Sequence, residues 1–479
     1  MRKYLFLLAI LHSYCACSQS GASKKNEQDT LITKKLNEVV IRGARDQTIE
    51  RLPDISETYI CSGKKNEVIN VQSLDANIAE KTPRQIFAKI PGIFVYDMDG
   101  TGNQVNISTR GLDPHRGWEF NIRKNGVITN SDMYGYPASH YSMPMEAVDR
   151  IELVRGTGSL QFGAQFGGML NYVTKQPDTT KAFSFESINS GGSFGLISTY
   201  NAISGRTGKF QYYAYYSKRK SDGYRDNSKS DYDAQSFMLI YSPVKNFKVT
   251  TEISRSNYTY QIPGPLTDSM FQANPRQSTR ARNYFNPEIF VPSIRLDWRI
   301  NQNTNLSWTT SAVLGNRNSV QFDKPANVVD AINPLTLTYA QRQVDIDNFN
   351  SYTSELRLLH SYAFLNEQSS LAAGVQLMNN DLHRTQLGKG TTGSDFDLTL
   401  TQPGWGRDLH FKTKNIAFFA ENNFRLTPSL SINPGVRVEM GQSDVSGTIS
   451  YYNAQDIPNT IKHQFSLNRY CEFIPNKGN

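Results

Sequence analysis

The sequence has 479 residues, of which 20% are charged and 11% are aromatic, and its formal net charge is +8. This length suffices for two or three domains and excludes a single small module. The lysines and arginines are spread along the chain rather than gathered into a stripe, which argues against a nucleic-acid-binding surface.

The N-terminus has one uninterrupted apolar run, residues 5–11, which follows a positively charged start and precedes small residues. This order predicts a secretory signal peptide over residues 1–18, and the alternative is a buried N-terminal helix. The run is too short to span a bilayer as a helix. Removal of the segment leaves Cys61 and Cys471, which are too far apart in sequence to suggest a disulfide framework or a metal-thiolate cluster.

Residues 19–66 are predicted to form a mobile periplasmic tether. Its first half is rich in Lys, Asn, Gln and Ser and offers too little apolar surface to offset the entropy of ordering. Within residues 36–45 a short β-prone patch stands alone between polar residues, and such a segment can add itself as a strand to the sheet edge of a partner. The patch consists of Leu36, Asn37, Glu38, Val39, Val40 and Ile41.

Residues 67–178 are predicted to be a small mixed α/β domain. Strand-like segments occur at residues 68–71, 105–112, 117–122 and 148–154. A helix is predicted over residues 75–90, because side chains recur at helical spacing at Ile78, Thr82, Ile86 and Ile90. A Pro-Gly pair at residues 91–92 provides the stop.

From residue 182 onward, apolar and polar residues alternate strictly. One face of one segment carries Ile294, Leu296, Trp298 and Ile300, and the other carries Ser293, Arg295, Asp297 and Arg299. Eleven such strands fit between residues 182 and 440, and short connections alternate with long ones at residues 258–288, 321–348 and 379–410. This pattern predicts an antiparallel transmembrane β-barrel over residues 182–479. A soluble β-sandwich or propeller is the alternative, but a sandwich has no reason to keep its long loops at one end.

Four motifs between residues 81 and 177 resemble, in order, the plug of the TonB-dependent outer-membrane receptors. They are the helix-and-turn motif at residues 82–93, the R-G strand at residues 107–112, the strand at residues 148–156 and the closing segment at residues 162–174. The resemblance extends over essentially the whole chain, and the patch at residues 36–45 is similar to a TonB box. The fold that it implies is mainly β: an N-terminal mixed α/β plug, then an antiparallel barrel in the cell outer membrane.

Within that family, residues 112–116, 134–137 and 162–165 are similar to the plug of ferric dicitrate receptors. The resemblance implies import of a ferric chelate, ferric citrate or a similar siderophore, driven by a periplasmic TonB-type protein. The candidate ligand-binding residues are His115, Arg116, Tyr134, Tyr136 and Gln165, since guanidinium, amide and hydroxyl groups are donors for carboxylates. Outer-membrane lipid and lipopolysaccharide are the expected surroundings. Another substrate of the family (cobalamin, another metal chelate or a small glycan) and a passive porin or adhesin are the alternatives.

Other charged residues of the plug are predicted to be structural. Arg110, Arg150 and Arg155 are expected to pair with Glu146, Asp149 and Glu152 and to hold the plug in the barrel. The sequence has no metalloprotease, P-loop or nucleophile-elbow motif, so an enzyme is not expected. No bound metal or cofactor is expected beyond the transported ligand, and no nucleic-acid partner.

The strand count falls short of a closed barrel. Plugged barrels have about 22 strands, so eleven would leave two long unpaired edges in lipid, where each unsatisfied backbone group costs several kcal/mol. Residues 469–479 are polar and lack the aromatic terminal residue that closes most such barrels, which suggests that the reading frame is lost after about residue 463. The expectation is therefore a truncated or frameshifted and non-functional chain with an incomplete barrel.

Overall fold

The computed structural model describes residues 49–98, 100–131, 136, 140–156, 159–163, 165, 167–452 and 458–475, with backbone alone at 116, 159, 451–452 and 458–475. The chain divides into two compact units, Met1–Arg45 and Asp46–Asn479, and every described residue belongs to the second. The predicted signal peptide and the patch at residues 36–41 lie outside the described residues. Among the described residues, no helix is long and apolar enough to cross a membrane.

The first domain is built on a six-stranded mixed sheet. Its strand order is β1 (Ile49–Glu50), β4 (Asn66–Asn70), β9 (Val148–Arg155), β10 (Gly168–Thr174), β7 (Phe120–Lys124) and β8 (Val127–Ile128), with β10 and β7 parallel. Two hairpins accompany it: β2 (Ile55–Ser56) with β3 (Tyr59–Ile60), and β5 (Ile93–Asp97) with β6 (Val105–Thr109). The short helices are η1 (Val71–Ser73), α1 (Pro83–Ile86), η2 (His115–Gly117), η3 (Met145–Ala147) and α2 (Ser159–Phe162).

The helix predicted over residues 75–90 is wrong, since α1 is a single turn that starts at Pro83. Proline has no N–H to donate and is favoured at the first position of a helix, so it begins a helix here instead of continuing one. Lys81, just before it, has a left-handed backbone with φ of 57°. Ile86 and Ile90 are nonetheless buried, as the spacing predicted.

The domain also begins earlier than residue 67. Ile49 and Glu50 pair antiparallel with Ile69 and Val68, and the backbone N–H of Leu52 donates to Asn66. The segment from residue 49 to 66 is therefore ordered, not tether. Its apolar residues come singly or in pairs between polar ones, so no periodic pattern in the sequence predicts the short strands β1, β2 and β3.

The second domain is one antiparallel sheet in which strands follow one another in chain order. Its strands are β11 (Ser184–Gly192), β12 (Leu196–Thr207), β13 (Phe210–Ser221), β14 (Ser230–Val244), β15 (Phe247–Gln261), β16 (Tyr284–Asn301), β17 (Thr304–Gln321), β18 (Gln343–Phe364), β19 (Glu367–Lys389), β20 (Arg407–Thr427), β22 (Gly435–Tyr452) and β23 (Pro458–Pro475), with the short β21 (Leu430–Ile432) beside β20. The incomplete antiparallel barrel is confirmed, with one more strand, β23, than the eleven predicted. The eleven strands were predicted up to residue 440 only, so β23 lies beyond the segment in which strands were predicted.

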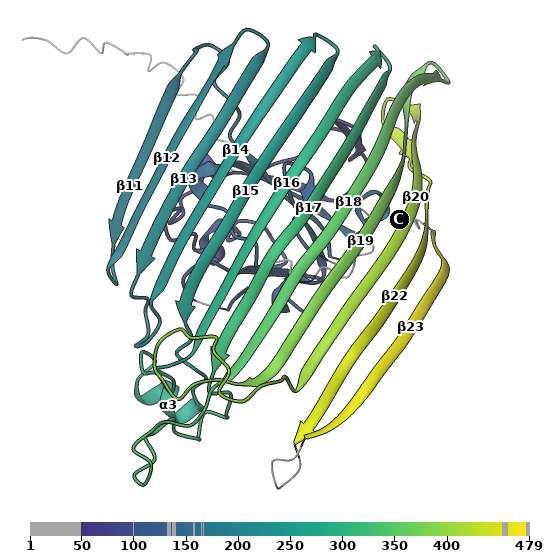
Figure 1. Cartoon of the computed structure of the whole chain (residues 1–479). Coiled ribbons are helices and arrows are strands. Elements are labelled where there is room, and N and C mark those ends of the chain that lie inside the picture. The colour runs from purple at the N-terminus through teal and green to yellow at the C-terminus, as the bar shows by residue number, and fades with distance from the viewer. Residues whose placement is uncertain are drawn as a thin grey trace, which may run out of the picture. The chain divides into compact units, whose positions relative to one another are not determined.

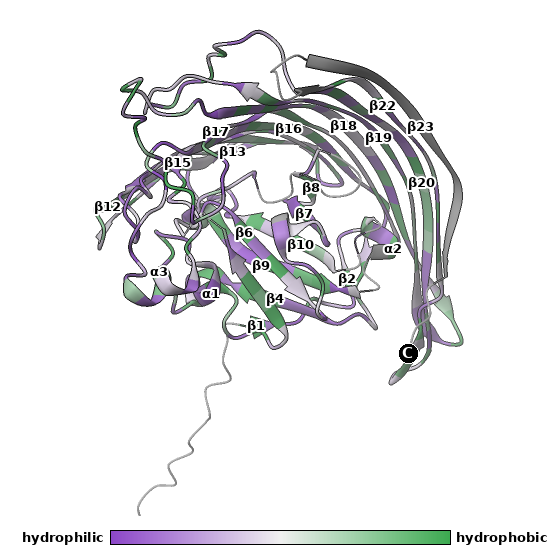
Figure 2. Cartoon of the chain, turned by 90° about the horizontal axis from the view of Figure 1, so that it is seen from below, coloured by the Kyte–Doolittle hydropathy of each residue, from purple (hydrophilic) through white to green (hydrophobic). Residues whose placement is uncertain are grey.

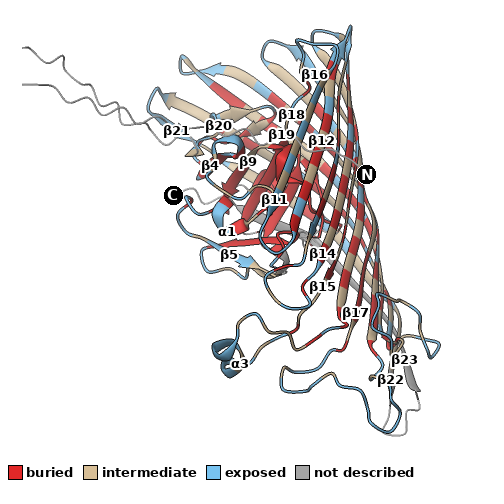
Figure 3. Cartoon of the chain, turned by 90° about the vertical axis from the view of Figure 1, so that its left-hand side faces the viewer, coloured by how far each residue is buried: buried red, intermediate tan, exposed pale blue. Residues whose placement is uncertain are grey.

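The sheet curves around the first domain, which lies on its concave side (Figure 2). Along most strands of this sheet, more buried residues alternate with more exposed ones (Figure 3). The predicted two faces of β16 are confirmed: Ile294 and Trp298 are exposed on the outer face, whereas Arg295 reaches Glu57 of the first domain. The inner face also carries a cluster of buried tyrosines on β12–β15, including Tyr200 and Tyr258.

The connections alternate in length, as predicted (Figure 1). Turns at residues 208–209, 245–246, 302–303 and 365–366 alternate with longer loops at residues 222–229, 262–283, 322–342 and 390–406, the second of which contains α3 (Asp268–Ala273). In transmembrane barrels the long loops face the outside of the cell and the short turns face the periplasm. This rule orients the sheet.

Three buried arginines join the three longest loops into one block. Arg282 donates to both carboxylate oxygens of Asp330, at 2.9 and 2.7 Å, and to the carbonyl of Thr392 at 3.2 Å. Arg280 donates to carbonyl groups of residues 322–328, and Arg342 donates to the carbonyl groups of residues 282 and 395. Each guanidinium meets acceptors from another loop, so the loops hold one another in place.

Candidate ligand site at the plug apex

A charged cluster forms where the first domain meets β17–β19 near the long-loop end of the sheet. Tyr136 donates its hydroxyl to Asp347 on β18 at 2.7 Å, and Arg384 on β19 donates from Nε and Nη2 to the same carboxylate at 2.9 and 3.1 Å. The Arg384 guanidinium also lies 5.1 Å from the centre of the Tyr136 ring. Burial and the neighbouring Asp347 raise the pKa of Tyr136 to about 12. Tyr136 is therefore a neutral donor at any physiological pH.

Arg317 on β17 has donor capacity that the described residues do not use. Its guanidinium lies 5.2 Å from the centre of the Phe285 ring and its Nη1 is 3.7 Å from Asp347, too far for a hydrogen bond. Its Nε and Nη1 are buried and have no hydrogen-bond partner among the described residues. A buried guanidinium with unmet N–H donors favours a further acceptor beside it, such as a carboxylate, because a buried donor without a hydrogen bond is costly.

The other predicted ligand residues have mixed positions. His115 is half-buried in η2, with its ring centre 6.3 Å from that of Tyr96. Arg116 belongs to the same turn but its side chain is not described, and Tyr134 lies outside the described residues. Trp118, which directly follows η2, packs edge-on against Tyr136 with ring centres 6.3 Å apart, so η2 and Tyr136 are brought together.

Gln165 is fully involved in the interior of the plug. Its Oε1 accepts a hydrogen bond from Asn121 at 3.2 Å, and Asn121 in turn accepts one from Arg123 at 2.7 Å. Gln165 is 6% exposed. These contacts give it a structural task next to Arg123, whatever its part in ligand binding.

Sequence reasoning missed the partners of Tyr136. Asp347, Arg384 and Arg317 lie on strands about 200 residues further along the chain, and His140 packs between Tyr136 and Phe285, with ring centres 5.7 and 5.3 Å apart. The signal was present as charged residues at inward positions of the alternating strands. Nothing in the sequence alone indicated which inward charge faces which plug residue.

Three buried ion pairs attach the first domain to the sheet. Arg123 Nη1 lies 2.9 Å from Glu355 Oε2, Lys124 contacts Glu252, and Lys64 contacts Glu421. In each pair the cation belongs to the first domain and the carboxylate to the sheet. Burial disfavours the charge on Lys124, but Glu252 outweighs it and raises the pKa of Lys124, so the pair stays ionised.

The ion pairs predicted for this attachment are wrong in part. Arg150 does pair with Asp149 at 3.3 Å and with Glu152 at 2.9 Å. All three residues belong to β9, so these pairs lie within the first domain and do not join it to the second. Arg155 pairs instead with Glu67, at 3.0 Å. The Arg110 guanidinium lies over Gly156, where a Cβ atom would come within 2.5 Å of it. The prediction paired charged residues that are close in sequence, whereas the pairing of strands brings Arg155 next to Glu67, which is distant in sequence.

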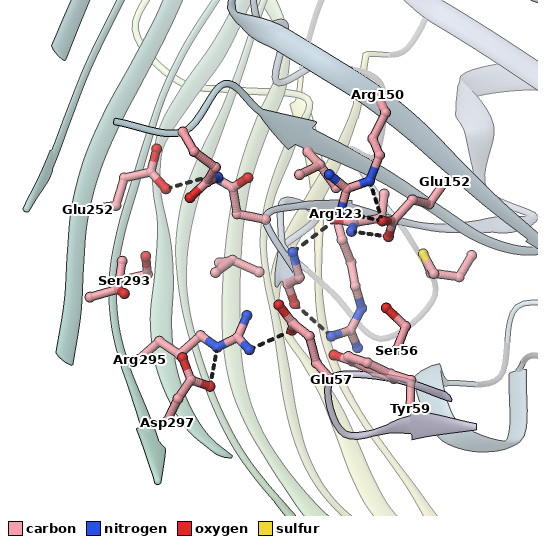
Figure 4. A pocket seen from close by; sticks show the side chains of 18 of the residues that line it. Ser56, Glu57, Tyr59, Arg123, Arg150, Glu152, Glu252, Ser293, Arg295 and Asp297 are labelled. Carbon is pink, nitrogen blue, oxygen red and sulfur yellow. Dashed lines mark hydrogen bonds and ion pairs between the residues drawn. The ribbon is translucent and has the colours of Figure 1, made fainter. Parts of the chain in front are cut away.

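A cavity of about 160 Å³ lies between the first domain and β14–β16, toward the short-turn end (Figure 4). Arg295 lines it and donates to Asp297 at 2.8 Å and to Glu57 at 2.5 Å. Cys61 also lines it, and burial raises the pKa of this thiol to about 12, so it is not a nucleophile at neutral pH. Within the described residues no group of His, Cys, Asp and Glu is placed to hold a metal ion.

Residues 62–169 match the family model described as TonB-dependent Receptor Plug Domain. The first domain is a TonB-dependent receptor plug. Plug and sheet together have the fold of the TonB-dependent receptors, which are proteins of the outer membrane.

Two curated relatives match in sequence. The chain is 28% identical over 144 residues to the vitamin B12 transporter BtuB of Photobacterium profundum, covering 30% of this chain and 22% of that protein. It is 25% identical over 153 residues to the ferric enterobactin receptor PirA of Pseudomonas aeruginosa, covering 30% of this chain and 19% of that protein. The chain thus spans about a fifth of the length of these relatives.

Solved structures match over a larger part of the chain. The unliganded ferric citrate transporter FecA superposes with a TM-score of 0.68 at 18% identity, covering 85% of this chain and 60% of that chain. The siderophore receptor PiuA of Acinetobacter baumannii superposes with a TM-score of 0.63 at 15% identity, covering 85% and 61%. These proteins are transport receptors, not enzymes, and this chain spans about 60% of their length.

Proposed function

We propose that this chain acts as a TonB-dependent receptor that binds an anionic ferric chelate, ferric citrate or a similar siderophore, and imports it across the outer membrane. The observation that carries the proposal is the unmet donor capacity of Arg317 beside Tyr136 and Arg384. Arginine binds carboxylates with paired donors, and the neutral Tyr136 hydroxyl fixes orientation. His115 and Arg116 are proposed to complete the site from the plug side.

Energy is proposed to reach the plug through its N-terminus. The patch Leu36–Ile41 pairs as a strand with a periplasmic TonB-type protein, which pulls on the chain. The first described contacts of the plug along the chain are weak. Strand β1 has only two residues, and the ion pair of Glu57 with Arg295 is weakened by solvent because Glu57 is half exposed. The three buried pairs at Lys64, Arg123 and Lys124 hold the rest of the plug.

Uptake of radiolabelled ferric citrate by cells that express the whole chain tests this function. Deletion of residues 36–41 is expected to abolish uptake and to leave binding to the cell surface intact. Arg317→Gln is expected to weaken surface binding at least about tenfold, because a charged hydrogen bond contributes roughly 1.5–3 kcal/mol. Arg150→Gln, at a plug arginine in a half-exposed pair, is the matched control and should bind normally. Uptake that survives the deletion would indicate a passive pore instead.

Cobalamin is the second candidate ligand, because the plug matches a vitamin B12 transporter in sequence. The same cells, offered labelled cyanocobalamin, distinguish the two. Cobalamin uptake that is insensitive to Arg317→Gln, with no uptake of ferric citrate, would favour this alternative.

A further inference from the structure

A patch of neutral polar side chains lines the inner face of β17–β22, below the candidate ligand site. Strand pairing places Arg317, Asp347 and Arg384 in one row, and the next row toward the short turns is apolar. The following two rows form what we call the inner polar patch: Ser351, Asn380, Thr413 and Ser443, then Ser311, Thr353 and Asn415. Two residues along a strand span about 7 Å, so the patch begins about 14 Å below the row of Asp347.

Buried atoms of the patch lack hydrogen bonds. Asn380 is 3% exposed, and neither its amide nitrogen nor its amide oxygen has a partner among the described residues. The same holds for the hydroxyl of Ser351 and the side-chain oxygen of Asn415, which belong to residues 3% and 5% exposed. One row further down, Gln376 accepts from Arg437 at 3.0 Å, but its amide nitrogen donates to no described residue. Buried polar groups are nearly always bonded, so this cluster indicates a partner from outside the chain.

The plug is attached to the sheet above and below the patch. Above it, Tyr136 donates to Asp347 at 2.7 Å, and below it, Arg123 lies 2.9 Å from Glu355. No described residue of the plug forms a hydrogen bond with a residue of the patch, and the hydrogen bond within the patch joins two of its own hydroxyl groups. A movement of the plug that releases the two attachments therefore breaks no hydrogen bond of the patch itself.

The opposite wall of the sheet is different. On β14 and β15 the plug is bonded directly to the side chains of the inner face: Tyr232 donates to the carbonyl of Ser142 at 3.0 Å, and Tyr141 donates to Ser254 at 2.8 Å. A ligand that passes on this side has to replace hydrogen bonds that are already made. The wall formed by β18–β20 offers groups that are still unbonded.

An anion that moves along the patch meets no unpaired carboxylate. Below the patch, Glu355 lies 2.7 Å from Arg357 in addition to its contact with Arg123, and Glu439 lies 2.6 Å from Arg437. The patch itself carries no charge. Amide and hydroxyl groups bind a carboxylate less strongly than paired guanidinium donors do, so a ligand bound here remains free to move on.

We propose that the inner polar patch is a second, weaker binding station for the transported chelate between the plug apex and the periplasm. The amide nitrogens of Asn380 and Gln376 donate to carboxylates of the chelate, and the side-chain oxygens of Ser351 and Asn415 accept from its hydroxyl groups. The ligand class is therefore an anionic, hydroxylated chelate that passes between the plug and β18–β20. This inference rests on the proposed function, because it takes a chelate bound at Arg317 as its starting point.

Cysteine accessibility in energised cells tests the route. Ser351→Cys is compared with Ser254→Cys, since both serines are buried on the inner face but only Ser254 is bonded to the plug, through Tyr141. Both variants are made in the whole chain with Cys61 and Cys471 changed to Ser, and are treated with a small cationic methanethiosulfonate. Neither is expected to react at rest. During uptake of ferric citrate, Ser351→Cys should be labelled at least about tenfold faster than Ser254→Cys, because exposure of a buried thiol sets the rate.

Transport kinetics provide the second readout. Asn380→Leu keeps the volume of the side chain and removes both amide atoms. It is expected to leave surface binding of ferric citrate unchanged and to lower the uptake rate about fivefold, since one hydrogen bond contributes about 1 kcal/mol. Asn380→Asp should lower uptake further, because its carboxylate repels an anionic chelate. Asn379→Leu, at the exposed neighbour on the outer face of the same strand, is the matched control and should transport normally.

Intact surface binding of each variant shows that it is folded and inserted. Equal labelling of the two cysteine variants, faster labelling of Ser254→Cys, or normal uptake by Asn380→Leu would each overturn the station while the receptor still binds and imports ferric citrate. A chain without substitutions that neither binds nor imports ferric citrate would instead contradict the proposed function, and the station with it.

Discussion

Glu355→Gln is expected to loosen the plug more than any substitution at an exposed plug charge. Glu355 accepts from Arg123 of the plug at 2.9 Å and from Arg357 of its own strand at 2.7 Å. The side chains of the three residues are 6%, 1% and 4% exposed. The neutral amide therefore leaves two buried guanidinium groups without their shared anion.

The magnitude follows from this burial. Breaking a buried ion pair by removing one partner costs roughly 3–5 kcal/mol, because the remaining charge stays desolvated. Arg123 keeps its bonds to Asn121 and to the carbonyl of Gly126, which places the cost toward the lower end of that range. At about 2 kcal/mol per M of urea, the midpoint of plug release falls by about 1.5–2 M.

Trp118 provides the readout, because it is the one plug residue among the four tryptophans of the sequence. With Trp298, Trp308 and Trp405 changed to Phe, fluorescence during urea unfolding in detergent micelles reports the plug. Arg150→Gln is the control, since its pair is about 40% exposed and should contribute under about 1 kcal/mol. An unchanged midpoint for Glu355→Gln, or equal shifts for the two variants, would refute the reasoning.

Three further predictions use the same plug-release assay or proteolysis. Tyr136→Phe should lower the free energy of plug release by about 1–3 kcal/mol, because Asp347 loses a hydrogen-bond donor. The pKa of Tyr136 is raised to about 12 in the folded plug, from about 10 in the unfolded chain. The difference in stability from wild type is therefore full below about pH 10 and fades as the pH rises toward about 12. Gly168→Ala should cost at least about 2 kcal/mol, since φ there is 115° and a Cβ would lie 1.9 Å from the Val154 carbonyl oxygen. Arg282→Met should speed proteolysis of loop 322–342 at least about tenfold, and an unchanged rate would show that Asp330 is not what holds that loop.

Local sequence patterns were sufficient to predict most of the fold. Alternation along β16, with Ile294 and Trp298 opposite Arg295, depends on neighbouring residues alone and predicts which face meets lipid. The loop lengths then gave the orientation, and the plug motifs identified the domain that fills the concave side. These features repeat every two residues or stand in short contiguous motifs, so one sequence suffices to find them.

The contacts between distant segments could not be predicted in this way. Tyr136 was a candidate, yet its partner Asp347 is 211 residues further along the chain. Lys64 and Glu421 form a buried pair across 357 residues. Such pairings depend on how the plug is seated on the sheet, which no local pattern records. The helix predicted over residues 75–90 was wrong for a different reason. The prediction gave more weight to the apolar spacing than to Pro83, whereas in the structure Pro83 starts the helix.

The central claim is that the plug lies against the inner face of the sheet of its own chain. Cysteine cross-linking in intact outer membranes tests it most directly, with Lys124→Cys and Glu252→Cys joined by a short bismaleimide and the product identified by mass spectrometry. The account predicts an intramolecular cross-link for this pair. A chain that inserts in the membrane but gives no cross-link between positions 124 and 252 would contradict it.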